Sequence, residues 1–289
     1  MSWPESLARE IAENRCIFHL GSGLSCQSVD ENQERPLSWS NLLTDLNDRV
    51  VSDSGLRLLV SEFISEKKFL DAAEIIRTHG HQADFYSIIT ECFFTKRYIP
   101  SSSHNIIVEV SPKIIVTTNY DSIIEDAMIE ISGRNSFHSF EYNTDGLIDA
   151  IRSPATILLK FHGCAQHSRN IILSRSDYFK LRDEHNVTFE IVTSLYKINT
   201  VLFIGCGIED PDINLILENI RLRIGTSSPS YALVGSLSYA AKIKESIKKQ
   251  YNIELIIYEQ ADPHDHSKFE EILSSLKDKV EEVKAKYGI

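Results

Sequence analysis

Short apolar runs alternate with segments of helical periodicity along most of this chain, and that alternation constrains its fold more than any other feature. The expected strands are six apolar runs, at residues 16–20, 113–118, 156–161, 201–204, 231–234 and 253–258. The helical segments that flank them lie at 2–14, 120–131, 174–182, 187–197, 211–223, 240–249 and 267–287. Strands that are apolar throughout, with helices between them, are typical of a parallel sheet covered on both faces. We therefore predict an α/β fold, a Rossmann-like doubly wound parallel sheet of about six strands.

Residues 37–110 differ from the rest because they carry helical periodicity and little strand signal. The clearest helical segments are 38–51, 69–79 and 84–94. We predict that 37–110 form an inserted helical subdomain, and that 1–36 and 111–289 form the Rossmann-like domain. A chain of 289 residues is long enough for one core domain with an insert.

Composition excludes several classes of partner and location. A formal net charge of -11 argues against direct nucleic-acid binding, which draws on clustered Lys and Arg. The five cysteines form no CxxC pair, which indicates reduced thiols. There is no secretion signal at the N-terminus and no apolar run near the roughly 20 residues that span a bilayer. We expect a cytoplasmic protein without a membrane partner.

Ligands of such sheets bind at the carboxyl ends of the strands, so residues directly after strands are the candidates for a site. The first set is the turn Gly21-Ser22-Gly23-Leu24-Ser25, where glycines let the backbone approach a pyrophosphate. Cys26 stands in place of the third glycine of a GxGxxG pattern, and a plain strand-to-helix turn accounts for the residues equally well.

Polar residues follow the next two strands. Thr118, Asn119 and Asp121 come after the second strand; the Asn amide can hold a sugar hydroxyl or a water, or Asn119 can cap the following helix. His162 follows the third strand, where it serves either as a general base near neutral pH or as a structural residue. From spacing alone, both alternatives stay open for Asn119 and for His162.

Two later strand ends complete the set. Gly205 and Cys206 follow the fourth strand, and Asp210 and Asp212 after them could bind hydroxyl groups or cap a helix. Gly235 follows the fifth strand and suits either an adenosine-side loop or a turn. Each signal is weak alone, but together they occupy successive strand ends that would line one crevice.

At this point the sequence resembles a family. LGSGLS, TTNYD, FHG and FIGCGIEDPDI, which begin at residues 20, 117, 161 and 203, resemble the serial motifs of sirtuins. PLSW at 36–39 and DPDI at 210–213 look more like the divergent bacterial sirtuin-like domains of antiphage defence. The resemblance covers about residues 15 to 260.

The resemblance implies roles for the residues at the strand ends. The implied catalytic residues are Asn119 and Asp121, which address the nicotinamide ribose and hold a water, and His162, the general base. The implied dinucleotide-binding residues are Gly21, Ser22, Gly23 and Ser25 at the phosphates, Thr118 beside them, and Gly205, Cys206 and Gly235 at the adenosine side.

One departure from the family decides the expected substrate class. Protein-deacylating sirtuins carry a zinc ribbon with two CxxC pairs, and this chain has none. His264-Asp265-His266 resembles a metal cluster but is better interpreted as a loop before a capped helix. We therefore expect no zinc or other metal. The resemblance to the antiphage-defence domains then implies a glycohydrolase whose substrate is NAD and whose products are nicotinamide and ADP-ribose.

An enzyme that destroys NAD must stay silent until it is triggered, as in abortive infection. The resemblance implies a homo-oligomer or a partnership with a HerA-like hexameric ATPase. Two other functions stay open. One is an NAD-dependent protein deacylase or ADP-ribosyltransferase, and the other is a non-catalytic nucleotide-binding scaffold subunit.

Overall fold

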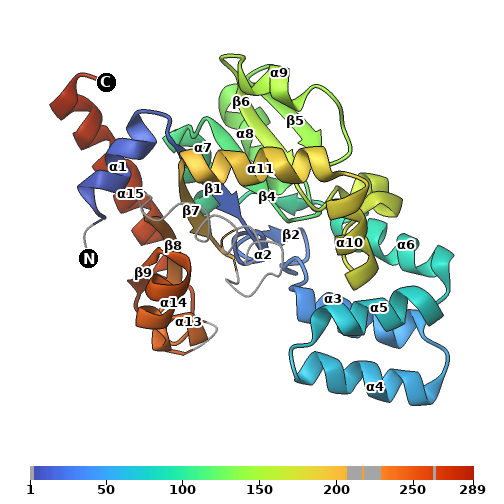
Figure 1. Cartoon of the computed structure of the whole chain (residues 1–289). Helices are drawn as coiled ribbons and strands as arrows, with labels where there is room; N and C mark the ends of the chain where they lie inside the picture. The colour runs from blue at the N-terminus through green and yellow to red at the C-terminus, as the bar shows by residue number, and fades with distance from the viewer. Residues whose placement is uncertain (1–2, 207–216, 218–228, 263–264) are drawn as a thin grey trace.

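The computed structural model describes residues 3–206, 217, 229–262 and 265–289, and it is built around a parallel sheet (Figure 1). The sheet has seven strands in the order β5-β6-β4-β1-β7-β8-β9, and every neighbouring pair is parallel. The strands are β1 (Cys16–Leu20), β4 (Ile114–Thr117), β5 (Phe137–Glu141), β6 (Thr156–Lys160), β7 (Thr200–Ile204), β8 (Ser230–Gly235) and β9 (Ile253–Tyr258). The predicted Rossmann-like α/β class is confirmed.

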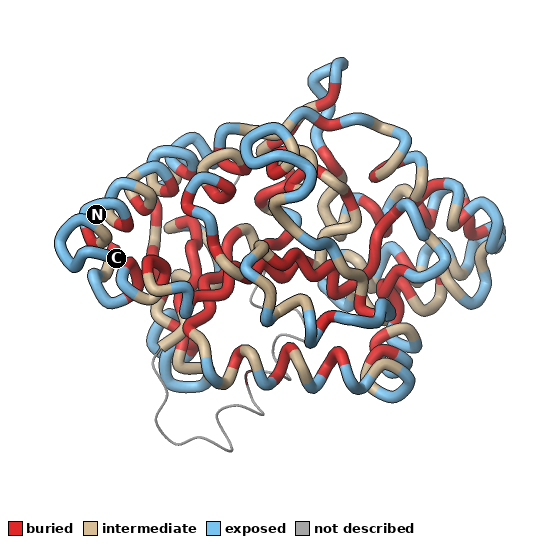
Figure 2. Tube along the Cα trace, turned by 90° about the horizontal axis from the view of Figure 1, so that it is seen from above, coloured by how far each residue is buried: buried red, intermediate tan, exposed pale blue. Residues whose placement is uncertain are grey.

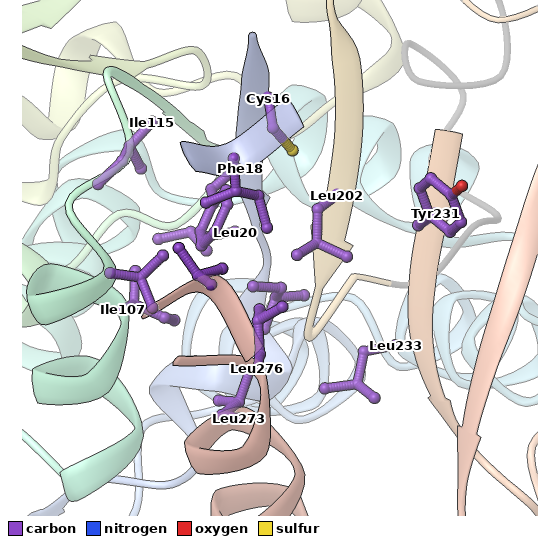
Figure 3. Close-up of a cluster of buried hydrophobic side chains, with 14 of the residues drawn as sticks. Cys16, Phe18, Leu20, Ile107, Ile115, Leu202, Tyr231, Leu233, Leu273 and Leu276 are labelled. Atoms are coloured by element: carbon purple, nitrogen blue, oxygen red, sulfur yellow. The ribbon is translucent and has the colours of Figure 1, made fainter. Parts of the chain in front are cut away.

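Helices cover both faces of the sheet, which is why its central strands are apolar throughout (Figures 1 and 2). One face packs against α1 (Glu5–Ala12), α7 (Ser102–Val110), α8 (Ile123–Ser132) and α15 (Phe269–Tyr287). The other packs against α9 (Leu147–Ile151), α10 (Arg175–Asp183), α11 (Asn186–Ile198), α13 (Tyr239–Lys242) and α14 (Lys244–Tyr251). Figure 3 shows the first of these cores, where Phe18 and Leu20 of β1 lie near Leu273 and Leu276 of α15.

A third hydrophobic cluster belongs to the helices before α7. They are α3 (Trp39–Val50), α4 (Ser54–Ser65), α5 (Phe69–His79) and α6 (Gln82–Thr90), followed by the π-helical turn Glu91–Thr95. A short antiparallel pair, β2 (Val29–Asp30) with β3 (Tyr98–Ile99), joins the chain at both sides of these helices. The cluster also takes in three residues that follow β6, namely Ala165, Ile171 and Leu173. The helices thus share a core with the chain after β6.

The structure adds elements that the sequence pattern does not predict. The seventh strand, β5, lies at the edge of the sheet and pairs only with β6. Its side chains are at least partly exposed, so FHSFE lacks the continuous apolar character of the other strands. Helix α4 is a further addition, and the helix predicted at 240–249 is divided into α13 and α14. The helix predicted at 211–223 lies outside the described residues. None of the helices in the described ranges has the length and apolar character needed to cross a bilayer.

Candidate functional site

The loops after β1, β4, β6 and β7 lie together at the end of the sheet formed by the carboxyl ends of its strands. There they bring the predicted residues together. Strand β1 lies between β4 and β7. After β1 the chain builds the sheet on the β4 side, and after β7 it builds the opposite side. The carboxyl ends of β1 and β7 therefore form a topological switch point, which is where open α/β sheets bind their ligands.

A hydrogen-bond network joins the glycine-rich turn to the segment after β4. Asn119 Nδ2 donates to Ser25 Oγ at 2.9 Å, and Ser25 Oγ donates to Asp121 Oδ2 at 2.7 Å. The second oxygen of that carboxylate, Oδ1, accepts from the main-chain N–H of Ile123 at 3.1 Å. Ser25 and Asp121 are buried. The Asn119 amide thus has a fixed orientation, with its NH2 group on Ser25.

The alternative interpretation of Asn119 as a helix cap is wrong. Helix α8 begins at Ile123, three residues later than predicted, and Ser122 occupies the N-cap position. The main-chain N–H of Asn119 instead donates to Thr117 Oγ1 at 3.1 Å. It is Asp121, and not Asn119, whose side chain bonds to an N–H of the first turn. The Asn119 side chain therefore belongs to the network at the strand ends.

His162 follows β6 and is buried at the same carboxyl end of the sheet. Its ring meets the ring of Tyr178, on α10, edge to face with 5.1 Å between centroids, and lies nearly parallel to the ring of Phe161 at 5.7 Å. Its main-chain oxygen accepts from the N–H of Ile172 at 3.0 Å. These contacts hold both the backbone and the ring of His162.

A cavity of about 80 Å³ lies between these side chains. Its polar wall consists of Ser22, Ser25, Thr118, Asn119, Asp121 and His162. Its apolar and aromatic wall consists of Leu37, Trp39, Leu42, Phe93, Tyr120 and Tyr178. Four of those six, Leu37 to Phe93, come from the predicted helical insert, and sequence reasoning missed them as site residues. The PLSW motif at 36–39 was a signal that could have placed Leu37 and Trp39 there.

The two glycine turns pack directly on each other. The N–H groups of Gly21 and Gly23 donate to the main-chain oxygens of Ile204 and Gly205, at 3.0 and 2.9 Å. A Cβ atom on Gly21 would lie 2.6 Å from the Gly205 oxygen. Because both N–H groups are used within the protein, they are not free to hold phosphates. Of the four predicted phosphate-binding residues, Ser22 and Ser25 line the cavity just described.

A second cavity, of about 570 Å³, lies at the ends of β7, β8 and β9. Gly205, Cys206 and Gly235, the predicted adenosine-side residues, line it together with Ser22 and Gly23. Cys206 Sγ donates to the main-chain oxygen of His19 at 3.2 Å, which makes it part of the turn. The predicted hydroxyl-binding Asp210 and Asp212 lie outside the described residues.

Ser22 lines both cavities, so the small cavity and the larger one both border the glycine turn. This layout suits a ligand with two ends and a bridge between them. Among the described residues, no group of three or more His, Cys, Asp or Glu could hold a metal ion, and His264 lies outside them. The fold is thus that of a Rossmann-like α/β protein, and its candidate site lies at the switch point, where sheets of this class bind their ligands.

Comparison with known proteins shows which proteins of this class the chain is similar to. Residues 113–256 match the family model of the SIR2-like domain. The chain is 26% identical over 214 residues to NAD(+) hydrolase ThsA of Cytobacillus dafuensis, covering 74% of this chain and 39% of that protein. It is 27% identical over 220 residues to Defense-associated sirtuin 2 of Bacillus subtilis, covering 74% and 20%. The chain is thus similar to SIR2-like proteins over residues 113–256, and its matches span less than half the length of these relatives.

Ser25→Ala tests the network, because it removes the hydroxyl that links Asn119 to Asp121. We expect the free energy of unfolding to fall by about 1–3 kcal/mol, since a buried carboxylate loses a donor. Denaturant unfolding measures this change. The control is Ser28→Ala, a buried hydroxyl whose contact with His104 Nδ1 is longer, at 3.5 Å. Equal effects of the two substitutions would contradict a special role for Ser25.

Proposed function

We propose that this protein is an NAD glycohydrolase, which uses water to split NAD into nicotinamide and ADP-ribose and depletes NAD in bacterial antiphage defence. The observation that carries the proposal is the convergence of Asn119, Asp121 and His162 on a small cavity that shares Ser22 with a larger one. Relatives named NAD(+) hydrolase and Defense-associated sirtuin support the same assignment.

The reaction places specific demands on the small cavity. The bond from the ribose to the nicotinamide nitrogen breaks through an oxocarbenium-like state, in which the ribose gains positive charge. The bonding electron pair leaves with nicotinamide, whose ring loses its charge. The buried carboxylate of Asp121 supplies negative charge beside the ribose, in a place where water screens it little.

The incoming water needs an orienting acceptor and a base. Because Asn119 Nδ2 donates to Ser25, its oxygen Oδ1 is the atom that serves a ribose hydroxyl or the water. His162 takes a proton from the water while the oxygen of that water bonds to the ribose carbon. His162 later passes the proton to solvent. The aromatic wall around Trp39 and Phe93 holds the nicotinamide ring and excludes bulk water.

Assembly is the proposed control of this activity. NAD hydrolysis by an unregulated enzyme would kill the host, so we place the active form in a homo-oligomer or in a complex with a HerA-like hexameric ATPase. The cytoplasm is the proposed location, and five cysteines outside any disulfide fit its reducing conditions.

The test is incubation of the purified protein with NAD, alone and with the candidate ATPase, across a range of protein concentrations. We expect nicotinamide and ADP-ribose in equal amounts, which chromatography measures, with release that rises steeply as the protein assembles. Release of O-acetyl-ADP-ribose from an acetylated peptide would instead favour a deacylase. Binding of ADP-ribose without nicotinamide release under any condition would favour a scaffold subunit.

A further inference from the structure

Lys160, the last residue of β6, is almost completely buried, with 2% of its surface exposed. Lysine is rarely buried to this extent unless its charge is paired. The ammonium group donates to Glu125 Oε1 at 3.0 Å and also to the main-chain oxygen of Asp121. One cation from the strand of His162 therefore holds the turn that carries Asn119 and Asp121.

The surroundings of Lys160 favour the charged form of its ammonium group. Burial alone lowers the pKa of Lys160, but the nearby negative charges, that of Glu125 above all, outweigh burial and raise the pKa above its ordinary value. A charged ammonium donor makes the bond to the Asp121 oxygen a charge-assisted one, roughly twice as strong as a neutral hydrogen bond.

The turn that Lys160 holds has little regular structure of its own. Residues 118–122 lie between β4 and α8, outside both elements. The Asp121 carboxylate is fixed by Ser25 and by the N–H of Ile123, while its main-chain oxygen is fixed by Lys160. Lys160 precedes His162 by two residues, so the same contact sets the distance between the two halves of the site.

Stability alone does not account for a buried Lys–Glu pair. The free energy needed to remove both charges from water is about as large as the electrostatic attraction between them. An apolar pair of similar volume is therefore often equally or more stabilising. Apolar side chains at positions 125 and 160 would satisfy the core but could not hold the oxygen of Asp121.

We propose that Lys160 is a positioning residue, which acts through the main-chain oxygen of Asp121 to hold the Asn119–Asp121 turn at its working distance from His162. Glu125 keeps the ammonium group charged and aimed at that oxygen. The effect on turnover rests on the proposed NAD hydrolysis, whereas the effect on the turn itself does not.

The test separates positioning from stability by comparing Lys160→Met with the double variant Lys160→Met/Glu125→Leu. The single change leaves a buried unpaired carboxylate, so it lowers Tm. The double variant is expected to recover Tm close to that of the wild type. Its kcat for NAD is expected to stay about 100-fold low with KM within about threefold, because a misplaced reacting group has an effect of this size.

Lys113→Met is the matched control. The ammonium group of Lys113 also donates to two main-chain oxygens, those of Ser153 and Ala155, but at the opposite end of the sheet. This change is expected to lower Tm and to leave kcat within about twofold. Recovery of both Tm and kcat in the double variant would show that Lys160 is only structural, and would overturn the proposal.

A second measurement does not depend on turnover. Hydrogen–deuterium exchange of the peptide covering 117–123 is expected to speed up at least tenfold in the double variant and to stay unchanged in Lys113→Met. If the wild type releases no nicotinamide, the proposed function fails, and exchange alone still decides the role of Lys160. Unchanged exchange in the double variant would overturn that role even in an active enzyme.

Discussion

His162→Ala and Asn119→Ala are each expected to abolish NAD hydrolysis while the protein stays folded. His162 is the proposed base, and general-base assistance is worth about 10²–10⁴-fold in rate. Asn119 orients the ribose or the water through a side chain that Ser25 already holds in place. Loss of either side chain therefore removes a group that acts on the reacting atoms, and not a member of the hydrophobic core.

Nicotinamide release at saturating NAD measures the effect, and thermal unfolding together with ADP-ribose binding verifies that the site is intact. His167→Ala is the matched control, because His167 follows the same strand but is exposed and pairs with Glu141 at 2.5 Å. We expect His167→Ala to keep full activity. Full turnover by either site variant would refute the assignment of the site.

The double variant His162→Ala/Asn119→Ala adds a check on the mechanism. Residues that act as one unit show strongly non-additive effects, since removal of the first already forfeits most of the benefit of the second. We therefore expect the double variant to be hardly slower than His162→Ala alone. If the fold-reduction in turnover of the double variant equalled the product of the two single reductions, the two residues would act in separate steps.

The sheet could be predicted from the sequence because its strands are buried on both faces. In β1 all five residues are buried, and a short apolar run that stops at a glycine is typical of such a strand. The edge strand β5 was not predicted, for the opposite reason: its residues His138 and Ser139 are exposed. A strand paired on one side, with its side chains partly in water, has no continuous apolar pattern to find.

The candidate site was predictable in its residues but not in its contacts. Local sequence could not choose between Asn119 and Ser122 as the start of α8, because both residue types cap helices well. Nor could it show that the N–H groups of Gly21 and Gly23 are used by the chain after β7. That contact depends on strand order, which places β1 beside β7 although about 180 residues separate them along the chain.

The aromatic wall of the small cavity was beyond sequence reasoning for a similar reason. Trp39 and Phe93 belong to helical segments whose pattern indicates only that they bury an apolar face. Which helices turn a side chain toward the strand ends is decided by packing in the third cluster, where Trp39 meets Phe69 with 5.1 Å between ring centroids. The insert therefore contributes to the site through tertiary contacts that no local motif encodes fully.

Gly205→Ala is expected to have the largest effect on stability of any single methyl group added at the site. Gly205 has φ of +67°, a left-handed conformation that costs an alanine about 1–2 kcal/mol. Its new Cβ would also lie 2.3 Å from the Leu24 nitrogen and 2.9 Å from the carbonyl carbon of Gly23. Both are backbone atoms that cannot rotate away, so the two turns must separate.

We expect the free energy of unfolding to fall by about 3 kcal/mol or more, because overpacking is added to backbone strain. Gly288→Ala is the control that isolates backbone strain, since Gly288 is left-handed, with φ of +69° and ψ of 36°, and nothing lies within 4 Å of its added Cβ. It should lose only about 1–2 kcal/mol. Denaturant unfolding of both variants gives the comparison, and equal losses would refute the tight packing of the two turns.

Ligand binding should separate the same two variants. The turn after β7 lines the larger cavity, and Ser22 on the opposing turn lines both cavities. Forcing the turns apart moves Ser22 relative to Cys206, so a dinucleotide can no longer contact both cavities in one pose. Gly205→Ala should therefore weaken ADP-ribose binding at least tenfold in calorimetry under conditions where it is folded. Gly288→Ala, at the C-terminal end of α15 and outside the lining of both cavities, should bind as the wild type does.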